Sequence, residues 1–145
     1  VRAAQAEALL AMHQRAPEAG GVEHGRADDP SWEEAIPAPL PPADGLLLGD
    51  FNMEPGSPEH ALLAGEPHPR HGRLPRLDAF ADAWTAAGHA ENEGHTFYAN
   101  WPSRQGKRID YAFLSAGLVP ALRGVEVDRD ADGSDHQPVW VDLDL

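Results

Sequence analysis

The first residues of the chain show a helical pattern of apolar positions. Val1, Ala4, Ala8, Leu9 and Met12 recur at helical spacing, and the polar residues between them fall off that face. This pattern predicts an amphipathic helix over residues 1 to about 15. We expect its apolar side to pack against the rest of the fold.

Segments rich in branched and aromatic residues predict strands along the remainder of the chain. These predicted strands cover residues 46–48, 96–98, 108–115, 119–127 and 138–145. The first is uniformly apolar, which predicts a short buried strand. The last alternates most clearly, because Val139 and Val141 fall on one face while Trp140 and Asp142 fall on the other. Such alternation is typical of a strand with one buried face.

Start and stop signals mark two further helices between the first two strands. The Ser-Pro pair at residues 57–58 predicts one helix start. Asp78 predicts another, for a helix over residues 79–87 that Gly88 ends. Residues 68–73 contain Pro, Arg and Gly and predict a loop between the two helices.

A proline-rich acidic segment, residues 17–44, separates the first helix from the first strand. Its composition cannot sustain a helix or a central strand, so we predict a long surface loop. The loop is longer than most connections inside a compact domain. It is either a solvated insertion, which is the favoured interpretation, or a functional lid.

Composition limits the chemistry that the chain can perform. With 145 residues and 41% apolar content, the chain fits one domain with a core. No apolar run approaches about 18 residues, so no membrane span is expected. Cysteine is absent, which excludes disulfides and thiolate sites and leaves carboxylates, histidines, amides and hydroxyls. A net charge of −13 would repel a polyanion unless metal ions or clustered arginines intervene.

Three short polar segments stand at predicted strand boundaries. They are Gly-Asp-Phe-Asn at residues 49–52, Arg-Ile-Asp-Tyr at 108–111 and Ser-Asp-His-Gln-Pro at 134–138. Ligand sites in open α/β sheets favour the ends of strands. Each segment alone is more often structural, because Asp and Asn in turns usually satisfy backbone donors. Their combination is what indicates a site.

In this order, the three segments resemble the C-terminal motifs of the endonuclease/exonuclease/phosphatase superfamily. This superfamily includes apurinic-site repair nucleases, DNase I-like enzymes, sphingomyelinases and inositol-polyphosphate phosphatases. The resemblance covers nearly the whole chain and is most specific at residues 46–52 and 134–138. It implies the C-terminal half of a DNase I-like four-layer α/β sandwich, with mixed, mostly antiparallel sheets flanked by helices. It also implies phosphodiester or phosphomonoester hydrolysis by metal-activated water, without a covalent enzyme intermediate.

The resemblance assigns a role to each polar residue. Asp50 would orient and deprotonate the attacking water, and Asn52 would bind the scissile phosphate or steady Asp50. Asp110 would hold His136 through a carboxylate–imidazole hydrogen bond, so that the other ring nitrogen faces a phosphate oxygen. Asp135 would help to bind the metal or place the water, with Asp50 and Asn52 also near the metal. Such an oxygen-rich site suits Mg²⁺, or Mn²⁺, better than structural zinc.

The N-terminal motifs of the family have no counterpart in this sequence. Its metal-binding glutamate and a His-bearing strand would precede the first helix, and neither Glu7 nor Glu54 is placed to replace that glutamate. We therefore expect residues 1–145 to be the C-terminal part of a single domain whose N-terminal half is absent, with weak stability and little activity alone. The alternative is a non-catalytic remnant or binding module that retains these motifs.

Substrate recognition is the least determined feature. Arg104, Lys107 and Arg108 cluster before Asp110 and are candidates for contacting a substrate phosphate, although Arg108 could instead brace its strand. The acidic composition disfavours a sequence-independent nuclease. Nucleic acid, a small phosphodiester and a phospholipid headgroup all stay open as substrates, and no protein partner is predicted.

Overall fold

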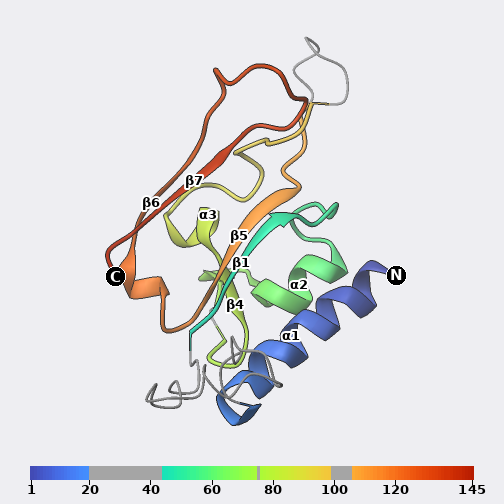
Figure 1. Ribbon diagram of the computed structural model, residues 1–145, viewed down its shortest axis with the longest axis vertical. Helices are drawn as coiled ribbons and strands as arrows, with labels where there is room; N and C mark the ends of the chain where they lie inside the picture. Colours follow the sequence, from blue (N-terminus) through green and yellow to red (C-terminus); the bar gives the residue numbers. More distant parts are fainter. Residues whose placement is uncertain (20–43, 75, 99–105) are drawn as a thin grey trace, which may run out of the picture.

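A three-stranded antiparallel sheet lies at the centre of the computed structural model, which describes residues 1–19, 44–74, 76–98 and 106–145 (Figure 1). The strands run in the order β1-β5-β4. They span Leu46–Asp50 in β1, Asp110–Ser115 in β5 and Phe80–Asp82 in β4. The predicted α/β class, with antiparallel sheets flanked by helices, is confirmed.

The middle strand, β5, supplies side chains to two hydrophobic clusters. Successive residues of a strand point to opposite faces of its sheet. Tyr111 and Phe113 therefore join one cluster, and Ala112 and Leu114 join the other. The sheet is buried on both faces at β5, which explains why residues 111–114 of this strand are all apolar or aromatic.

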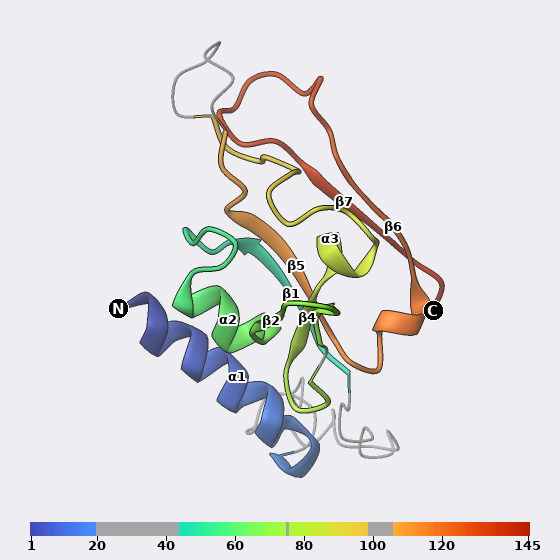
Figure 2. The same cartoon turned by 180° about the vertical axis from the view of Figure 1, so that it is seen from behind.

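Two helices cover the face that carries Tyr111 and Phe113. They are α1, Arg2–Ala19, and α2, Pro58–Ala64, which lie side by side in Figure 2. The start of α2 is confirmed, because Ser57 Oγ accepts a hydrogen bond from His60 N at 3.2 Å.

The short helix α3, Ala83–Ala86, and a β-hairpin cover the opposite face. The hairpin pairs β6, Leu122–Val127, with β7, Val139–Leu143 (Figure 1). The predicted alternation in β7 is confirmed, since its valines are partly buried while Trp140 is exposed.

Helix α1 confirms the first predicted helix but packs on a different side. Ala6 is buried, and Leu9 and Leu10 pack against the core. Met12, by contrast, is 63% exposed, and Val1 is fully exposed. Alanine covers several sides of this helix, so the apolar pattern is a weak guide to orientation, and packing against α2 decides it.

Strand β1 confirms the predicted strand at residues 46–48, but the expectation that it is buried is wrong. Leu46 and Leu48 are 40% and 64% exposed. The reason is its place at the edge: β1 pairs with β5 on one side, and no described strand pairs with it on the other.

The helix predicted for residues 79–87 is largely wrong. Residues 80–82 form β4 and pair with β5, and α3 begins only at Ala83. Asp82, not Asp78, caps α3, because its Oδ1 accepts a hydrogen bond from Trp84 N at 3.0 Å. Asp78 pairs with Arg76 instead.

Smaller differences concern connections. Residues 68–73, predicted as a loop, lie within a small hairpin of β2, Pro67–His68, and β3, Gly72–Arg73. Within residues 96–98, Phe97 forms two isolated bridges instead of a strand. Of the predicted loop over residues 17–44, the first three residues end α1, and residues 20–43 lie outside the described residues.

No helix in the described part of the chain combines the length and the apolar character that crossing a membrane requires.

One stretch predicted as a strand, residues 119–127, begins instead with a 3₁₀ turn, Val119–Ala121, before β6.

Candidate active site at the ends of β1 and β5

Asp50 and Asp110 are brought together by the pairing of β1 with β5. They are direct partners in the antiparallel register, one at the end of β1 and the other at the start of β5. Side chains of directly opposed residues project from the same face of a sheet. The two carboxylates are therefore neighbours, although 60 positions separate them in sequence (110 − 50). Like charges in such a position repel, so the pair is suited to a cation or to strong donors.

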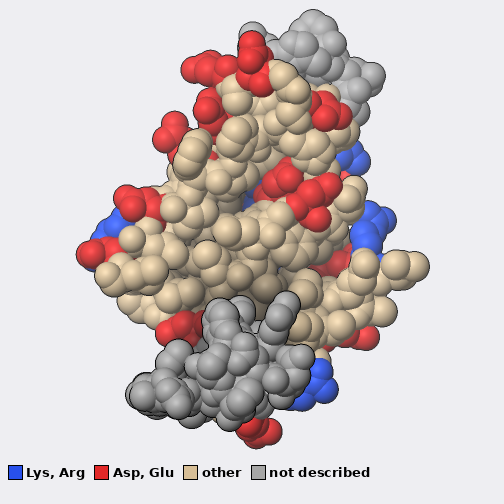
Figure 3. All heavy atoms as spheres, viewed as in Figure 1, with Lys and Arg blue, Asp and Glu red and all other residues tan. Residues whose placement is uncertain are grey.

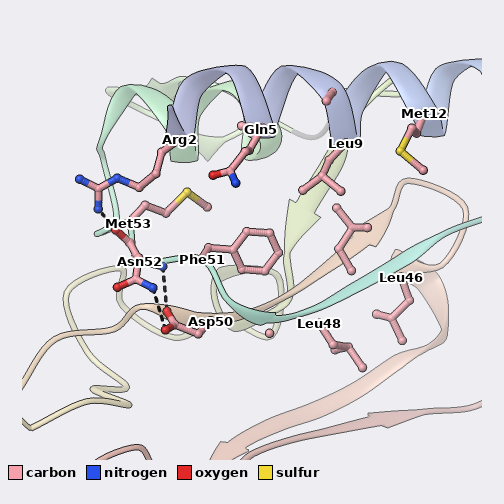
Figure 4. A pocket seen from close by; sticks show the side chains of 14 residues that line it. Arg2, Gln5, Leu9, Met12, Leu46, Leu48, Asp50, Phe51, Asn52 and Met53 are labelled. Atoms are coloured by element: carbon pink, nitrogen blue, oxygen red, sulfur yellow. Dashed lines mark hydrogen bonds between the residues drawn. The ribbon is translucent and has the colours of Figure 1, made fainter.

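Asn52 fixes the orientation of Asp50. Its backbone N–H donates to Asp50 Oδ1 and its Nδ2 donates to Asp50 Oδ2, each at 2.8 Å (Figure 4). Asn52 has φ of 51°, the one positive value among described residues other than glycine. Asn visits this left-handed conformation more readily than most residues. Both oxygens of Asp50 are thus held by a turn that suits asparagine.

His136 lies against Asp110 from the loop that precedes β7. Its Nδ1 is 3.0 Å from Asp110 Oδ2 and 3.2 Å from Oδ1. An ionised carboxylate can only accept a hydrogen bond, so Nδ1 carries the proton and donates it. The ring also packs on Phe97, with 4.9 Å between ring centroids. In the neutral ring, this arrangement places the proton on Nδ1 and leaves Nε2 to face a ligand.

The surrounding carboxylates raise the pKa of His136. Partial burial by itself lowers that pKa, but the hydrogen bond to Asp110 and the charges of Asp110, Asp50 and Asp135 outweigh it. His136 is therefore more readily cationic than a free histidine. A cationic imidazole is suited to face the oxygens of a phosphate group.

Asp135 stands at the surface beside this histidine. Its carbonyl oxygen accepts a hydrogen bond from Tyr98 N at 3.0 Å, and Ser134 Oγ accepts one from His136 N at 3.0 Å. These bonds fix the backbone of the segment while the carboxylate of Asp135 is exposed. The five residues proposed from the motifs, Asp50, Asn52, Asp110, Asp135 and His136, thus gather around the ends of β1 and β5.

An open groove of about 790 Å³ runs from Asp50 and Asn52 between α1 and β1. Figure 4 shows its apolar lining, with Leu9 and Met12 on the helix side. Arg2 Nη1 donates a hydrogen bond to the carbonyl oxygen of Asn52. The start of α1 is therefore tied to the turn that orients Asp50.

The side chain of Arg108 lies in the interior of the protein. Its side chain is 3% exposed, Nη1 donates to Asp82 Oδ2 at 2.6 Å, and Nη2 donates to the Glu91 carbonyl oxygen at 3.2 Å. This placement fits the bracing role and not contact with a substrate phosphate. Arg104 lies outside the described residues. Lys107 pairs with Glu54 at the surface, at 2.6 Å.

A buried polar cluster that the sequence patterns did not predict lies behind the site. His60 Nε2 lies 3.1 Å from Asp82 Oδ2, the oxygen that also binds Arg108, and all three residues are at most 3% exposed. Burial by itself raises the pKa of Asp82, but the hydrogen bond from His60 and the charge of Arg108 hold it below its usual value. Asp82 carries the same helix-start signal as Asp78, but its contacts with His60 and Arg108 depend on tertiary packing.

The donors at the candidate site suit a hard divalent cation, but the described residues do not complete a metal site. Carboxylate and amide oxygens, as in Asp50, Asn52 and Asp135, are ligands that Mg²⁺ takes. Within residues 1–19, 44–74, 76–98 and 106–145, however, no group of three His, Asp or Glu side chains is arranged to hold a metal ion. The expected Mg²⁺, or Mn²⁺, stays a prediction for which this chain offers part of the ligand set.

Among the charged side chains on the face that Figure 3 shows, acidic ones are commoner than basic ones. Figure 3 shows Asp and Glu scattered over one face, with Lys and Arg mainly at its margins. This distribution agrees with the net charge of −13. A long polyanion would meet repulsion over most of this face.

The fold and the carboxylate–histidine site agree with the class of protein that the three motifs indicated. Comparison with family models then identifies the family, because residues 22–136 match the Endonuclease/Exonuclease/phosphatase family. The match covers most of the chain, and the chain belongs to this family. The resemblance proposed from the sequence is confirmed.

A solved structure similar to the chain is that of the 3′ phosphatase NExo from Neisseria bound to a product DNA hairpin. The two are 22% identical with a TM-score of 0.47, over 71% of this chain and 46% of that chain. The chain thus spans less than half the length of this protein. Likeness at this level carries no argument about substrate. A search of curated proteins gave no match.

Proposed function

We propose that the full-length protein hydrolyses phosphoester bonds, in monoesters or diesters, with water as the nucleophile. The observation that carries this proposal is the convergence of Asp50, Asn52, Asp110 and His136 at the ends of two paired strands. Membership of the Endonuclease/Exonuclease/phosphatase family supports the reaction class.

In this proposal, Asp50 orients the attacking water and takes its proton. The two hydrogen bonds from Asn52 support a positioning role for that residue, because they hold both oxygens of Asp50. His136, in its cationic form, donates from Nε2 to a phosphoryl oxygen as negative charge gathers there, while Nδ1 donates to Asp110, which orients the ring and stabilises its positive charge.

We further propose that the full-length protein binds Mg²⁺, or Mn²⁺, near Asp50, Asn52 and Asp135. At least one more ligand must come from outside the described residues, since these do not complete a site. A bound cation would neutralise charge on the phosphoryl oxygens. The acidic pair Asp50 and Asp110 would also repel less beside a cation.

The acidic surface bears on the substrate. It disfavours a nuclease that binds long nucleic acid without regard to sequence, and favours a small phosphoester or a phospholipid headgroup. A panel of p-nitrophenyl phosphate, bis(p-nitrophenyl) phosphate, a short-chain phospholipid and a DNA duplex separates these classes.

The decisive experiment measures turnover of this panel by the full-length protein in Mg²⁺, with Asp50→Ala and His136→Ala as test variants. Loss of a proton-transfer group lowers rates by about 10²–10⁴-fold, and we expect a loss in this range in both variants without loss of fold. Asp132→Ala and His71→Ala, which remove exposed residues of the same types, serve as controls. Wild-type rates in both test variants would refute the catalytic roles proposed for Asp50 and His136.

Because the described residues do not complete a metal site, a binding module without catalysis is the second candidate function. It predicts that the full-length protein turns over no member of the panel in either Mg²⁺ or Mn²⁺. Turnover that disappears when EDTA removes the cation would therefore support the enzyme and exclude the binding module.

A further inference from the structure

Residues 96–98 lie between the two segments that carry Asp110 and His136. On one side, Phe97 forms a bridge with Lys107, and Thr96 N donates to the Lys107 carbonyl oxygen at 2.9 Å. On the other side, Phe97 forms a bridge with His136, and Gln137 N donates to the Thr96 carbonyl oxygen at 2.7 Å. This short piece of chain therefore joins the segments that meet in the Asp110–His136 pair.

The side chain of Thr96 makes the closest connection. It is fully buried, and its Oγ1 accepts hydrogen bonds from the backbone N–H groups of both Ile109 and Asp110, each at 3.1 Å. In a regular strand, consecutive N–H groups point to opposite sides. Their convergence on one oxygen marks a local turn of the backbone immediately before the Asp110 side chain.

We propose that Thr96 is the positioning residue of the Asp110–His136 pair. Its hydroxyl sets the backbone of Asp110, and its carbonyl oxygen sets the backbone of Gln137 beside His136. One residue thus fixes both halves of the pair from within the core. The catalytic consequence rests on the proposed function, whereas the effect on the geometry of the pair does not.

The hydroxyl is what the position requires. Valine has nearly the shape of threonine but offers no acceptor, so it leaves two buried N–H groups without a partner. The backbone of residues 109–110 must then shift toward another acceptor, and Asp110 shifts with it. A displacement of about 1 Å in a catalytic group can lower a rate about 100-fold.

The test compares Thr96→Val with Thr96→Ser in the full-length protein. Thr85→Val is the matched control, since Thr85 Oγ1 donates to the backbone carbonyl oxygen of Asp82 and does not contact the Asp110–His136 pair. We expect Thr96→Val to lower kcat by about 10–100-fold with little change in KM, because the pair is misplaced while the rest of the site persists. Thr96→Ser retains the acceptor and should keep most of the wild-type kcat.

A second readout needs no turnover. A ¹H–¹⁵N correlation spectrum of the His136 ring, recorded where the ring is neutral and assigned by its loss in His136→Asn, reports which nitrogen bears the proton. The wild type should show the proton on Nδ1, as donation to Asp110 requires. Thr96→Val should move it toward Nε2, the tautomer that free histidine favours, and Thr96→Ser and Thr85→Val should not.

The two readouts separate the failure of this inference from that of the proposed function. Absence of turnover in the wild type defeats the proposed function and leaves the tautomer measurement intact. A wild-type tautomer in folded Thr96→Val overturns the positioning role, and so does an equal loss in Thr96→Ser. If Thr96→Val does not fold, Thr96→Ala, which also lacks an acceptor, takes its place, and a wild-type ring in that variant counts equally against the inference.

Discussion

Asn52 combines a backbone and a side-chain function at the end of β1. Its left-handed conformation turns the chain after Phe51, and this turn allows its backbone N–H and Nδ2 to reach the two oxygens of Asp50. Other residue types meet only part of this requirement. Glycine takes the conformation but has no side-chain donor, and alanine has neither advantage.

Substitution of Asn52 should separate these two functions. Asn52→Ala should lower the free energy of unfolding by about 1–2 kcal/mol, because alanine lacks the short polar side chain whose local hydrogen bonds make the left-handed conformation acceptable to asparagine. Asn52→Gly should lose less stability but should still lose turnover, because Asp50 Oδ2 loses its donor. Urea unfolding of the full-length protein measures the first effect and turnover the second. Equal stability losses in the two variants would contradict the backbone argument.

At the scale of the elements, Asp82 links β4, α3 and the segment that leads into β5. It ends β4, its Oδ1 caps α3, and its Oδ2 binds Arg108, which lies two residues before the start of β5. His60 adds α2 to the same carboxylate. The cluster therefore connects both faces of the central sheet through one buried anion.

Asp82→Asn should be strongly destabilising, because it leaves Arg108 buried without its counter-ion. Breaking a buried pair in this way costs about 3–5 kcal/mol. Asp78→Asn is the control, since its pair with Arg76 lies at the surface and its loss should change stability little. Thermal unfolding of both variants checks the difference, and a near-neutral Asp82→Asn would show that the pair is not a strong contributor.

The lowered pKa of Asp82 predicts how stability depends on pH. A carboxyl whose pKa is lower in the folded state stabilises the fold above its unfolded pKa of about 3.9, and this contribution is lost as pH falls through the folded pKa. Wild-type stability should therefore drop below about pH 4. Asp82→Asn should lack this part of the drop, as urea unfolding at pH 3 and pH 6 would reveal. A drop of the same size in the variant would assign acid sensitivity to other carboxyls.

At the scale of the whole molecule, the open side of β1 is the main departure from a closed domain. Leu46 and Leu48 are exposed there, and the groove beside α1 is lined mainly by apolar side chains. Scattered apolar residues at a surface are ordinary, but a contiguous apolar groove beside a strand edge that no described strand pairs with is a liability for stability.

If the domain continues beyond residues 1–145, as the family resemblance predicts, these residues alone should unfold at a lower temperature than the full-length protein. They should also bind Mg²⁺ more weakly, because the described ligand set is incomplete. Intact mass of the native product, followed by calorimetry with Mg²⁺ on both forms, checks this. A native mass of 15.6 kDa with full activity would refute it.

Local patterns in the sequence determined the α/β class and the existence of most elements, and they marked the polar segments from which the family resemblance proposes the site residues. The first helix, the start of α2, β5 and the alternation of β7 follow from side-chain periodicity and capping, which act over a few neighbouring residues. Motif order pointed to Asp50, Asp110 and His136, because chemistry at strand ends is visible without knowing which strands pair.

Tertiary structure alone decided the features that depend on distant partners. The packing side of α1, the edge position of β1 and the conversion of residues 80–82 into a strand all depend on neighbours far away in sequence. The buried position of Arg108 against Asp82 is of the same kind. A local pattern states which residues prefer burial or a turn, whereas register and docking determine which partners they meet, and those contacts set the fold's geometry.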